Sequence, residues 1–490
     1  MYMQSKSIKR NISFLLCISI LACLLTVSSA FTASGESLAA QSLVYGDLND
    51  DGAIDAIDNS LLKQYLLGKI TAFPSPQGET AADVNKDKSI DALDLSLMKQ
   101  YLLGIIVKFP DAPTNPREII IPTYSQLKTN TKLPDPFKFW DGTSVTSKAD
   151  WTDRRAEISA FAQAFEYGTK PPKPTSVTGS YSNNTVTVNC TENGKTISFN
   201  CKITYPSTGK APYPAVIGIG YSTLNNTEIA KLGVAVITFP CDEIAAQVNA
   251  GSRGNGKFYT LYGSNHSAGA LMAWAWGVSR LIDVLETTPT ANIDATKLGV
   301  TGGSRYGKGA LTAGAFDDRI ALTIPQESGS GGAASWRVSD AQKQSGSNVQ
   351  TLSQIVTENC WYMNSFSQFG NSATRLPFDH HMIEGLCAPR GLLVIENTSM
   401  EWLGNVSCFT TGKTAHMIYE ALGVPNNMGY SSVGHPDHCG YPNSQIPELQ
   451  AFIKKFLLGD TTVNTTIMKQ DGGISFDKSR WVDWTIPTLQ

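Results

Sequence analysis

The sequence predicts a protein of the α/β class, a three-layer sandwich preceded by a small all-α module. Two observations predict this fold. Short apolar runs that suit buried parallel strands alternate with helical stretches beyond residue 122, and an acidic loop followed by a helix occurs twice before residue 107. The stretch between them, residues 107–122, includes four prolines and is typical of a linker. A chain of 490 residues is also long enough for more than one domain.

Residues 1–30 have the pattern of a secretory signal peptide. Lys6, Lys9 and Arg10 precede an apolar stretch over residues 12–27, and the small residues 28–30 suit a cleavage site. The alternative is an uncleaved anchor helix, but the apolar stretch is shorter than the roughly 20 residues that a membrane span needs. We therefore predict a secreted, extracellular protein with no membrane association after the signal is removed.

The composition is that of a soluble globular protein, with 41% hydrophobic and 17% charged residues. A formal net charge of −3 gives no reason to expect nucleic acid as a partner. Seven of the nine cysteines remain after signal removal, and an odd number leaves at least one free thiol. Cys190 and Cys201 flank a strand-like stretch with a turn, so we expect a hairpin disulfide between them. No cysteine or histidine cluster has the spacing of a zinc site.

The acidic repeat covers residues 47–68 and 83–104, and 15 of its 22 positions are identical in the two copies, so it is an internal duplication. Oxygen-bearing side chains recur at loop positions 1, 3, 5, 9 and 12, as a calcium loop requires. They are Asp47, Asn49, Asp51, Asp55 and Asp58 in the first loop, and Asp83, Asn85, Asp87, Asp91 and Asp94 in the second. The carbonyls of Ala53 and Ser89 are expected to add the seventh-position oxygen. Gly52 permits a sharp turn in the first loop, whereas Lys88 takes its place in the second.

A helix is expected after each loop and none before it. One helix has Leu61, Leu62, Tyr65 and Leu66 on its apolar face, and the other has Leu97, Met98, Tyr101 and Leu102. The paired repeats, residues 41–106, resemble the dockerin module of cellulosomal enzymes. That resemblance implies two structural Ca²⁺ ions and a cohesin of a scaffold protein as partner. Loop positions 10 and 11, which help dockerins to select the cohesin, are the apolar pairs 56–57 and 92–93.

Beyond the linker, apolar runs suited to buried parallel strands cover residues 215–219, 234–237, 297–300, 321–324 and 392–395. Helical stretches cover residues 268–285 and 447–458. The run at 297–300 leads into a glycine-rich turn that contains Ser304, followed by a helix expected to begin near Ala310. Strand, sharp turn and helix are the context of a nucleophilic serine, although the second glycine, Gly307, comes one residue later than in G-x-S-x-G. The competing phosphate-loop interpretation requires Ser or Thr after Lys308, where Gly309 stands.

A serine nucleophile needs a histidine base and an acid. His380 and His381 come before the strand at 392–395, too early for the base in this order of elements, and His416 lies on a probable helix. His435 and His438 share a loop, and the chemistry alone does not choose between them. For the acid, Glu327 and Glu401 both lie beyond strand ends, and both remain open at this point.

Residues 120–490 are similar to the glucuronoyl esterase family of carbohydrate esterases. The motifs that carry this resemblance are Gly302 to Ala310, Ile324 to Gly332, Asn348 to Thr351, Thr357 to Asn359, Glu401 to Leu403 and His438-Cys439. The resemblance implies an α/β-hydrolase domain over residues 123–490, monomeric and without a cofactor for catalysis. It implies Ser304 as nucleophile, His438 as base and Glu327 as acid. It also implies Arg305 at the oxyanion and Lys308, Gln350, Glu358 and Trp402 at the sugar.

Two departures from the family accompany this assignment. Some members carry an acid two residues before the tryptophan, where this chain has Met400, and this favours Glu327. Members often have a cysteine before the serine, bonded to the one after the histidine, but Gly303 leaves Cys439 without that partner. The expected reaction is hydrolysis of esters between 4-O-methyl-D-glucuronic acid of glucuronoxylan and lignin alcohols. The alternatives are an acetyl-xylan or feruloyl esterase, or a non-catalytic carbohydrate-binding component of a cellulosome.

Overall fold

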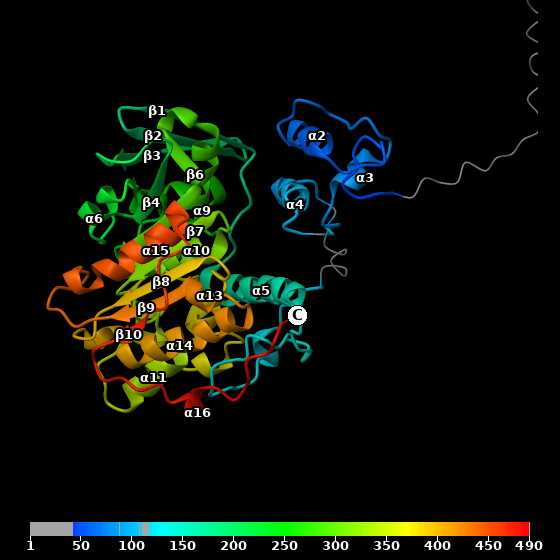
Figure 1. The fold of residues 1–490 in the computed structure, drawn as a ribbon. Helices are drawn as coiled ribbons and strands as arrows, with labels where there is room; N and C mark the ends of the chain where they lie inside the picture. Colours follow the sequence, from blue (N-terminus) through cyan, green and yellow to red (C-terminus); the bar gives the residue numbers. More distant parts are fainter. Residues whose placement is uncertain (1–42, 88, 107, 110–116, 490) are drawn as a thin grey trace, which may run out of the picture. The chain divides into compact units, whose positions relative to one another are not determined.

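The computed structural model describes residues 43–87, 89–106, 108–109 and 117–489. The chain divides into two compact units, Met1–Pro116 and Arg117–Gln490, drawn in blue to cyan and in cyan to red in Figure 1. The predicted signal peptide and the expectation for Lys88 lie outside the described residues. In the part of the chain that is described, no helix combines the length and the apolar character needed to cross a membrane.

The small unit contains the helices α2 (Ala56–Leu66), α3 (Gly78–Ala82) and α4 (Ala92–Leu102). The apolar faces predicted for the two long helices are confirmed, since Leu62 and Met98 are fully buried in one cluster with Leu48 and Val84. Each long helix begins at a capping box in which an aspartate caps the helix and the aspartate three residues later accepts a hydrogen bond from its backbone. The two copies therefore fold alike, as the duplication indicates.

The expectation that no helix precedes either loop is wrong for the second loop. The five-residue helix α3 ends at Ala82, directly before Asp83. Its small residues allow it to lie close to the unit's core: Ala81 and Ala82 are buried, and a Cβ at Gly78 would come within 2.3 Å of Phe73. Small side chains on a short segment give little apolar periodicity, so the sequence pattern did not reveal this helix.

One ten-stranded sheet forms the centre of the large unit, in the order β1-β2-β3-β5-β4-β6-β7-β8-β9-β10. The pairs from β5 through β4 to β10 are parallel, and β1, β2, β3 and β5 pair antiparallel. The strands are β1 (Ser176–Ser182), β2 (Thr185–Glu192), β3 (Lys195–Thr204), β4 (Tyr213–Ile219), β5 (Ala235–Phe239), β6 (Ile293–Gly303), β7 (Ile320–Gln326), β8 (Gly391–Glu396), β9 (Met428–Ser432) and β10 (Met468–Gln470). All five predicted strands are confirmed as β4 to β8.

Helices cover both faces of this sheet (Figure 1). They are α5 (Lys148–Ala162), α6 (Asn226–Lys231), α7 (Cys241–Ile244), α8 (Lys257–Tyr262), α9 (Ala270–Thr287), α10 (Arg305–Phe316), α11 (Trp336–Gln344), α12 (Leu352–Glu358), α13 (His380–Gly385), α14 (Asn405–Ala421), α15 (Ile446–Leu458) and α16 (Lys478–Trp481). Alternate residues of β4 divide between two cores: Ile217 packs with α9, and Val216 packs with α6 and α15. The three-layer sandwich predicted from the sequence is confirmed.

The expected hairpin does form from β2 and β3, but its disulfide does not. All seven described cysteines are free thiols. The register pairs Cys190 with Ile197 and Cys201 with Val186, so the two cysteines are four residue pairs apart along the ladder. Each residue advances a strand by about 3.3 Å, which puts the two thiols well beyond the reach of a disulfide. The expectation is therefore wrong because flanking a turn does not make two residues cross-strand partners.

Candidate functional site

Ser304 forms a sharp turn between the end of β6 and the start of α10. Its backbone has φ 56° and ψ −125°, in a region that side-chain-bearing residues rarely adopt. Its N–H donates to the carbonyl of Gln326, the last residue of β7. The helix begins at Arg305, five residues before the predicted start near Ala310. The prediction assigned the turn to the glycine-rich stretch, whereas Ser304 alone makes it. This geometry is that of a strained nucleophile elbow.

The glycines around Ser304 allow close approach of the chain rather than flexibility. A Cβ at Gly302 would lie 2.5 Å from the carbonyl oxygen of Tyr306, and one at Gly307 would lie 2.7 Å from the carbonyl oxygen of Gln326. Both positions are too tight for any side chain. The late second glycine therefore belongs to the first turn of α10, where the helix packs against β7.

Glu327 follows β7, is fully buried, and also has a positive φ of 45°. Its carboxylate lies between two histidines of one loop. Oε2 accepts a hydrogen bond from Nδ1 of His438 at 2.8 Å, and Oε1 lies 3.3 Å from Nε2 of His435. Glu401, the other acid that the sequence left open, instead accepts from the backbone N–H of Asn348. The structure therefore brings Glu327, and not Glu401, to the histidine loop.

The two histidines differ in what their ring nitrogens face. Nδ1 of His435 lies 3.2 Å from the amide nitrogen of Asn397 and its Nε2 faces Glu327, so the protein occupies both sides of the ring. His438 uses only Nδ1 for Glu327, and 31% of its side chain is exposed. Its ring also packs edge-on against Trp402, with centroids 5.6 Å apart. His438 is thus the histidine with a nitrogen available for chemistry.

Cys439 connects the histidine loop to the serine turn. A Cβ at Gly303 would lie 2.7 Å from Sγ of Cys439, so the residue after His438 packs on the residue before Ser304. No direct hydrogen bond joins Ser304 Oγ to His438 in the described structure, and such bonds commonly tighten only when substrate binds.

Arg305 is the first residue of α10, where backbone N–H groups have no partner within the helix. Its guanidinium lies 5.5 Å from the ring of Trp361, and Nη1 donates weakly to Oε1 of Gln247 at 3.5 Å. Gln247 is itself fixed, since its Oε1 accepts from Nε1 of Trp361 at 3.0 Å and its amide donates to Asp242. Gln247 and Trp361 had no sequence signal of their own, because both lie far from the serine motif along the chain.

Lys308 lies one turn further along α10 and is 4% exposed. Its Nζ donates to the carbonyl of Ser328 and lies 5.5 Å from the ring of Trp361. Burial lowers its pKa to about 8, against the opposing attraction of Glu396. Glu396, the last residue of β8, accepts from the backbone N–H of Ser328 at 2.9 Å. Burial and the neighbouring Glu327 raise its pKa to about 8.

The remaining predicted sugar-contacting residues form one group. The amide of Gln350 donates to Glu358 at 3.5 Å, and the backbone N–H of Gln350 donates to the carbonyl of Trp402 at 3.1 Å. Trp402 lies on the short helix η7 (Glu401–Leu403) and is 39% exposed, so its ring offers a face to solvent. Trp402 also packs against the ring of His438, which places this group beside the histidine loop.

Comparison with known proteins identifies the large unit. A family described as "Glucuronyl esterase, fungi" matches residues 188–423. The 4-O-methyl-glucuronoyl methylesterase of Hypocrea jecorina (strain QM6a) is 54% identical over 369 residues, covering 75% of this chain and 78% of that protein. The chain belongs to the glucuronoyl esterase family. It is a carboxylic ester hydrolase, as its relatives are.

Solved structures agree with this family. The glucuronoyl esterase catalytic domain from Hypocrea jecorina superposes with a TM-score of 0.72 at 54% identity, covering 74% of this chain and 99% of that one. A serine-to-alanine variant of glucuronoyl esterase from Sporotrichum thermophile, solved with methyl 4-O-methyl-β-D-glucopyranuronate, superposes with a TM-score of 0.72 at 47% identity. That comparison covers 76% of this chain and 99% of the other. The α/β-hydrolase-like sandwich is therefore the fold of this esterase domain.

The small unit matches the dockerin type I domain over residues 45–103. Its loops suit a hard cation. Asp58 and Asp94, at position 12, are fully buried, and burial together with the neighbouring carboxylates raises the pKa of each. A loop turns sharply at Asp50, with φ 61°, and at Gly52, with φ 86°. Converging buried carboxylates are stabilised when a cation offsets their charge, so the residues present fit calcium.

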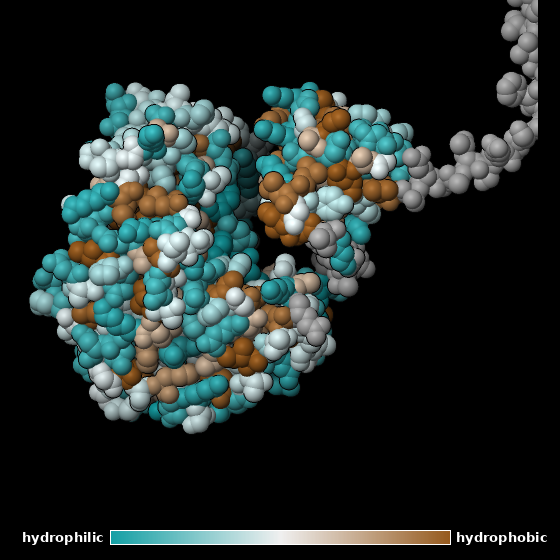
Figure 2. Space-filling view, in the orientation of Figure 1, coloured by the Kyte–Doolittle hydropathy of each residue, from teal (hydrophilic) through white to brown (hydrophobic). Residues whose placement is uncertain are grey.

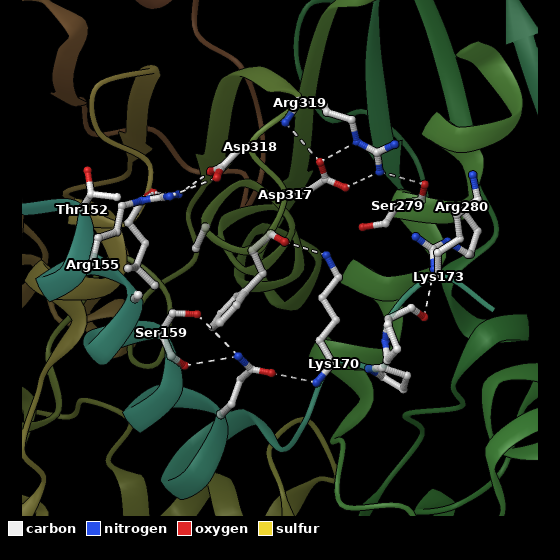
Figure 3. Close-up of a pocket in the computed structure, with 17 residues that line it drawn as sticks. Thr152, Arg155, Ser159, Lys170, Lys173, Ser279, Arg280, Asp317, Asp318 and Arg319 are labelled. Carbon is white, nitrogen blue, oxygen red and sulfur yellow. Dashed lines mark hydrogen bonds and ion pairs between the residues drawn. The ribbon is translucent and has the colours of Figure 1, made fainter. Parts of the chain in front are cut away.

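A cavity of about 650 Å³ lies at the amino-terminal end of β7, away from Glu327 (Figure 3). It is lined by Asp317, Asp318 and Arg319, which directly precede β7, whereas Glu327 follows that strand. Two of the arginines that line it form ion pairs with aspartates: Arg319 with Asp317 at 2.8 Å, and Arg155 with Asp318. Seven residues of strand separate this cavity from Glu327 by about 20 Å, so it is not part of the esterase site.

The other histidines are structural, as the sequence indicated for His416, which pairs with Glu420 on α14. His380 is buried with Nε2 2.9 Å from Glu166, and His381 is buried with Nε2 2.8 Å from the carbonyl of Pro134. Sequence reasoning missed Asn397, whose amide contacts His435 in the histidine loop. Its position two residues after the apolar strand predicted at 392–395 was a usable signal, because polar residues at the carboxyl ends of parallel strands gather at the site.

Proposed function

We propose that the enzyme cleaves esters between 4-O-methyl-D-glucuronic acid of glucuronoxylan and lignin alcohols, through an acyl-enzyme on Ser304. The observation that carries the proposal is the Glu327–His438 hydrogen bond beside a strained serine at the head of α10. Its support from the comparisons is the Sporotrichum thermophile relative that was solved with a methyl glucuronate ester.

In the proposed mechanism, His438 Nε2 takes the proton of Ser304 Oγ as the oxygen attacks the ester carbonyl. Glu327 fixes the tautomer with Nδ1–H and stabilises the imidazolium that forms. The backbone N–H of Arg305, at the N-terminus of α10, donates to the developing oxyanion, and each such donor contributes about 3 kcal/mol. The imidazolium then protonates the leaving alcohol. Water attacks the acyl-enzyme in the reverse sequence and releases the uronic acid.

Selection of a uronate ester is assigned to the group around Lys308. The ammonium of Lys308 and the pair Gln350–Glu358 offer hydrogen-bond donors and acceptors suited to sugar hydroxyls, and the exposed face of Trp402 suits a sugar ring. An acetyl-xylan or feruloyl ester presents no uronate ring to this group. Methyl 4-O-methyl-glucuronate should therefore be hydrolysed much faster than acetylated xylan, and the opposite ratio would favour the rival esterases.

The dockerin is proposed to bind two Ca²⁺ ions through the ten oxygen ligands and to attach the enzyme to a cohesin of a scaffold protein outside the cell. Ile57 and Leu93, at loop position 11, are 55% and 53% exposed. Hydrophobic patches are visible on the surface of this unit in Figure 2. Exposed apolar patches of this kind, with Ile57 and Leu93 exposed in the two copies, suit a protein partner. Chelation should abolish cohesin binding and leave ester hydrolysis intact, because metal binding and folding are coupled only in the dockerin.

The deciding experiment compares Ser304→Ala with the parent enzyme on methyl 4-O-methyl-glucuronate. Hydrolysis should fall to background while binding of the uronate product persists, because only the nucleophile is removed. His416→Ala serves as the control, since His416 pairs only with Glu420 on the surface of α14. Hydrolysis retained in Ser304→Ala would exclude the acyl-enzyme. Uronate binding by a parent without hydrolytic activity would favour the carbohydrate-binding alternative.

A further inference from the structure

Cys439 is a free thiol next to the nitrogen that the proposed mechanism uses as a base. Its Sγ lies 3.8 Å from Nε2 of His438. Glycine at position 303 faces the thiol and offers it no sulfur to bond. Ligand atoms of Glu327, His438 and Cys439 all lie within 4.8 Å of one another. A thiolate and an imidazole nitrogen at this distance are a donor pair that soft and borderline metal ions prefer.

We propose that Cys439 and His438 form a binding site for a thiophilic divalent cation, such as Zn²⁺ or Cd²⁺, and that its occupation switches the esterase off. The proposal goes beyond the ester hydrolysis assigned above. The metal site rests on geometry alone, and only its inhibitory effect rests on the proposed role of His438.

The distance between the two donor atoms fits a shared metal ion. Zn–S bonds of about 2.3 Å and Zn–N bonds of about 2.05 Å at a tetrahedral angle separate sulfur and nitrogen by about 3.6 Å. The observed 3.8 Å needs only a small rotation of either side chain. With 31% of the His438 side chain exposed, an ion can enter from solvent and complete its coordination with water.

The arrangement behind His438 is also that of a metal-binding histidine. Its Nδ1–H donates to the buried carboxylate of Glu327 at 2.8 Å, which leaves Nε2 with its lone pair toward Cys439. Metal-bound histidines commonly donate their other ring N–H to a carboxylate, because this fixes the ring and makes the ligating nitrogen more basic. The contact that suits His438 to remove a proton from Ser304 therefore suits it equally to bind a cation.

Inhibition follows from competition for one lone pair. A cation on Nε2 prevents His438 from accepting the serine proton, so each bound ion silences one enzyme molecule. Hard cations such as Ca²⁺ and Mg²⁺ should have no effect.

The test titrates the full chain with Cd²⁺ in excess Ca²⁺ and records the ultraviolet sulfur-to-cadmium charge-transfer band together with ester hydrolysis. Residues 31–116 contain neither cysteine nor histidine, so the dockerin cannot produce the band. The variant is Cys439→Ser, and the matched control is Cys190→Ala, whose thiol is buried in β2. Each protein's inhibition is expressed relative to its own metal-free rate.

In the parent and in Cys190→Ala, the band and the inhibition should rise together at the same Cd²⁺ concentration. In Cys439→Ser the band should vanish, and half-inhibition should require at least roughly tenfold more metal, since even a lost outer-shell partner costs that much. Equal inhibition of Cys439→Ser and the parent, or a parent without the band, would overturn the proposal. If Cys439→Ser does not fold, His438→Ala replaces it with the band as readout, and it should bind Cd²⁺ more weakly. A parent inactive without metal would refute the esterase mechanism, while the band would still test the metal site.

Discussion

His435 and His438 flank the same carboxylate, and replacing each in turn separates a positioning residue from a catalytic one. In the parent, Nε2 of His435 lies 3.3 Å from Oε1 of Glu327, and neither atom has a hydrogen-bond partner in the described structure. His435→Ala removes this neighbour of the Glu327 carboxylate. The variant also removes the ring that faces Asn397. The Glu327 carboxylate then keeps its hydrogen bond with His438 and a long one, at 3.5 Å, from the Asn397 amide, so it is held less firmly.

The expected loss can be estimated from that contact. A well-formed hydrogen bond to a charged group contributes about 1.5 to 3 kcal/mol, and this contact, at 3.3 Å and without hydrogen-bond geometry, contributes about 1.5 kcal/mol at most. A loss of about 1.5 kcal/mol in the transition state corresponds to roughly a tenfold fall in kcat. KM should change little, since His435 is not among the residues assigned to the sugar. Loss of His438, by contrast, removes the base and should cost roughly 10⁴-fold or more.

The assay measures kcat and KM on methyl 4-O-methyl-glucuronate from pH 5 to 9, with thermal unfolding measured alongside. His435→Gln should recover much of the rate, because its amide can donate to Glu327, and His416→Ala should match the parent throughout. If His435→Ala were as inactive as His438→Ala, the two roles would have to be exchanged. An unchanged kcat in His435→Ala would show that the second histidine does not position the acid.

Three further predictions follow from particular contacts. Gly303→Cys should form a disulfide with Cys439 and stabilise the fold by about 2–4 kcal/mol, because it closes a loop of more than 130 residues; chemical denaturation with and without dithiothreitol measures the gain, and a gain that survives reduction would contradict it. Glu396→Gln should become more stable relative to the parent as pH rises from 4.5 to 8. Over that range the unfolded parent loses the Glu396 proton while the folded state keeps it, so the parent alone loses stability; a gap in melting temperature that does not widen with pH would refute this reasoning. In the parent, inhibition by free 4-O-methyl-glucuronate should weaken as pH rises through about 8, where the Lys308 ammonium is lost; Lys308→Met should abolish that dependence, and an equal dependence in both proteins would exclude Lys308 from the uronate site.

Much of the fold was predictable because its signals are local. The five apolar runs became β4 to β8, and the duplicated loops led into α2 and α4, since strand and helix periodicity both follow from burial of one face. The strands β1, β9 and β10 and the helix α3 were not predicted. They are short or largely polar, so their local hydrophobic pattern is weak. The start of α10 was misplaced because glycine usually marks a turn, whereas here the glycines permit close packing of a helix.

The candidate site divides in the same way. Ser304 could be singled out from its strand, turn and helix context, but neither its base nor its acid could be chosen without the family resemblance. Glu327 and Glu401 both follow a strand, and only the assembled sheet turns one toward the histidine loop and the other toward the backbone of Asn348. Gln247 comes from a segment with no catalytic pattern, and it reaches the site through the packing of separate elements.

The sequence by itself determined the architecture of two units, the spacing of ten oxygen-bearing side chains in the duplicated loops and the serine at the head of a helix, because these depend on spacing within a few turns of chain. Only the tertiary structure decided which histidine keeps a free nitrogen, which acid supports it, and where Cys439 lies. Those relations join residues that are between 38 and 136 positions apart, and no local spacing encodes a distance across a sheet. The thiol beside His438 is the clearest case: the sequence shows a cysteine without its expected partner, and the fold shows what that cysteine faces.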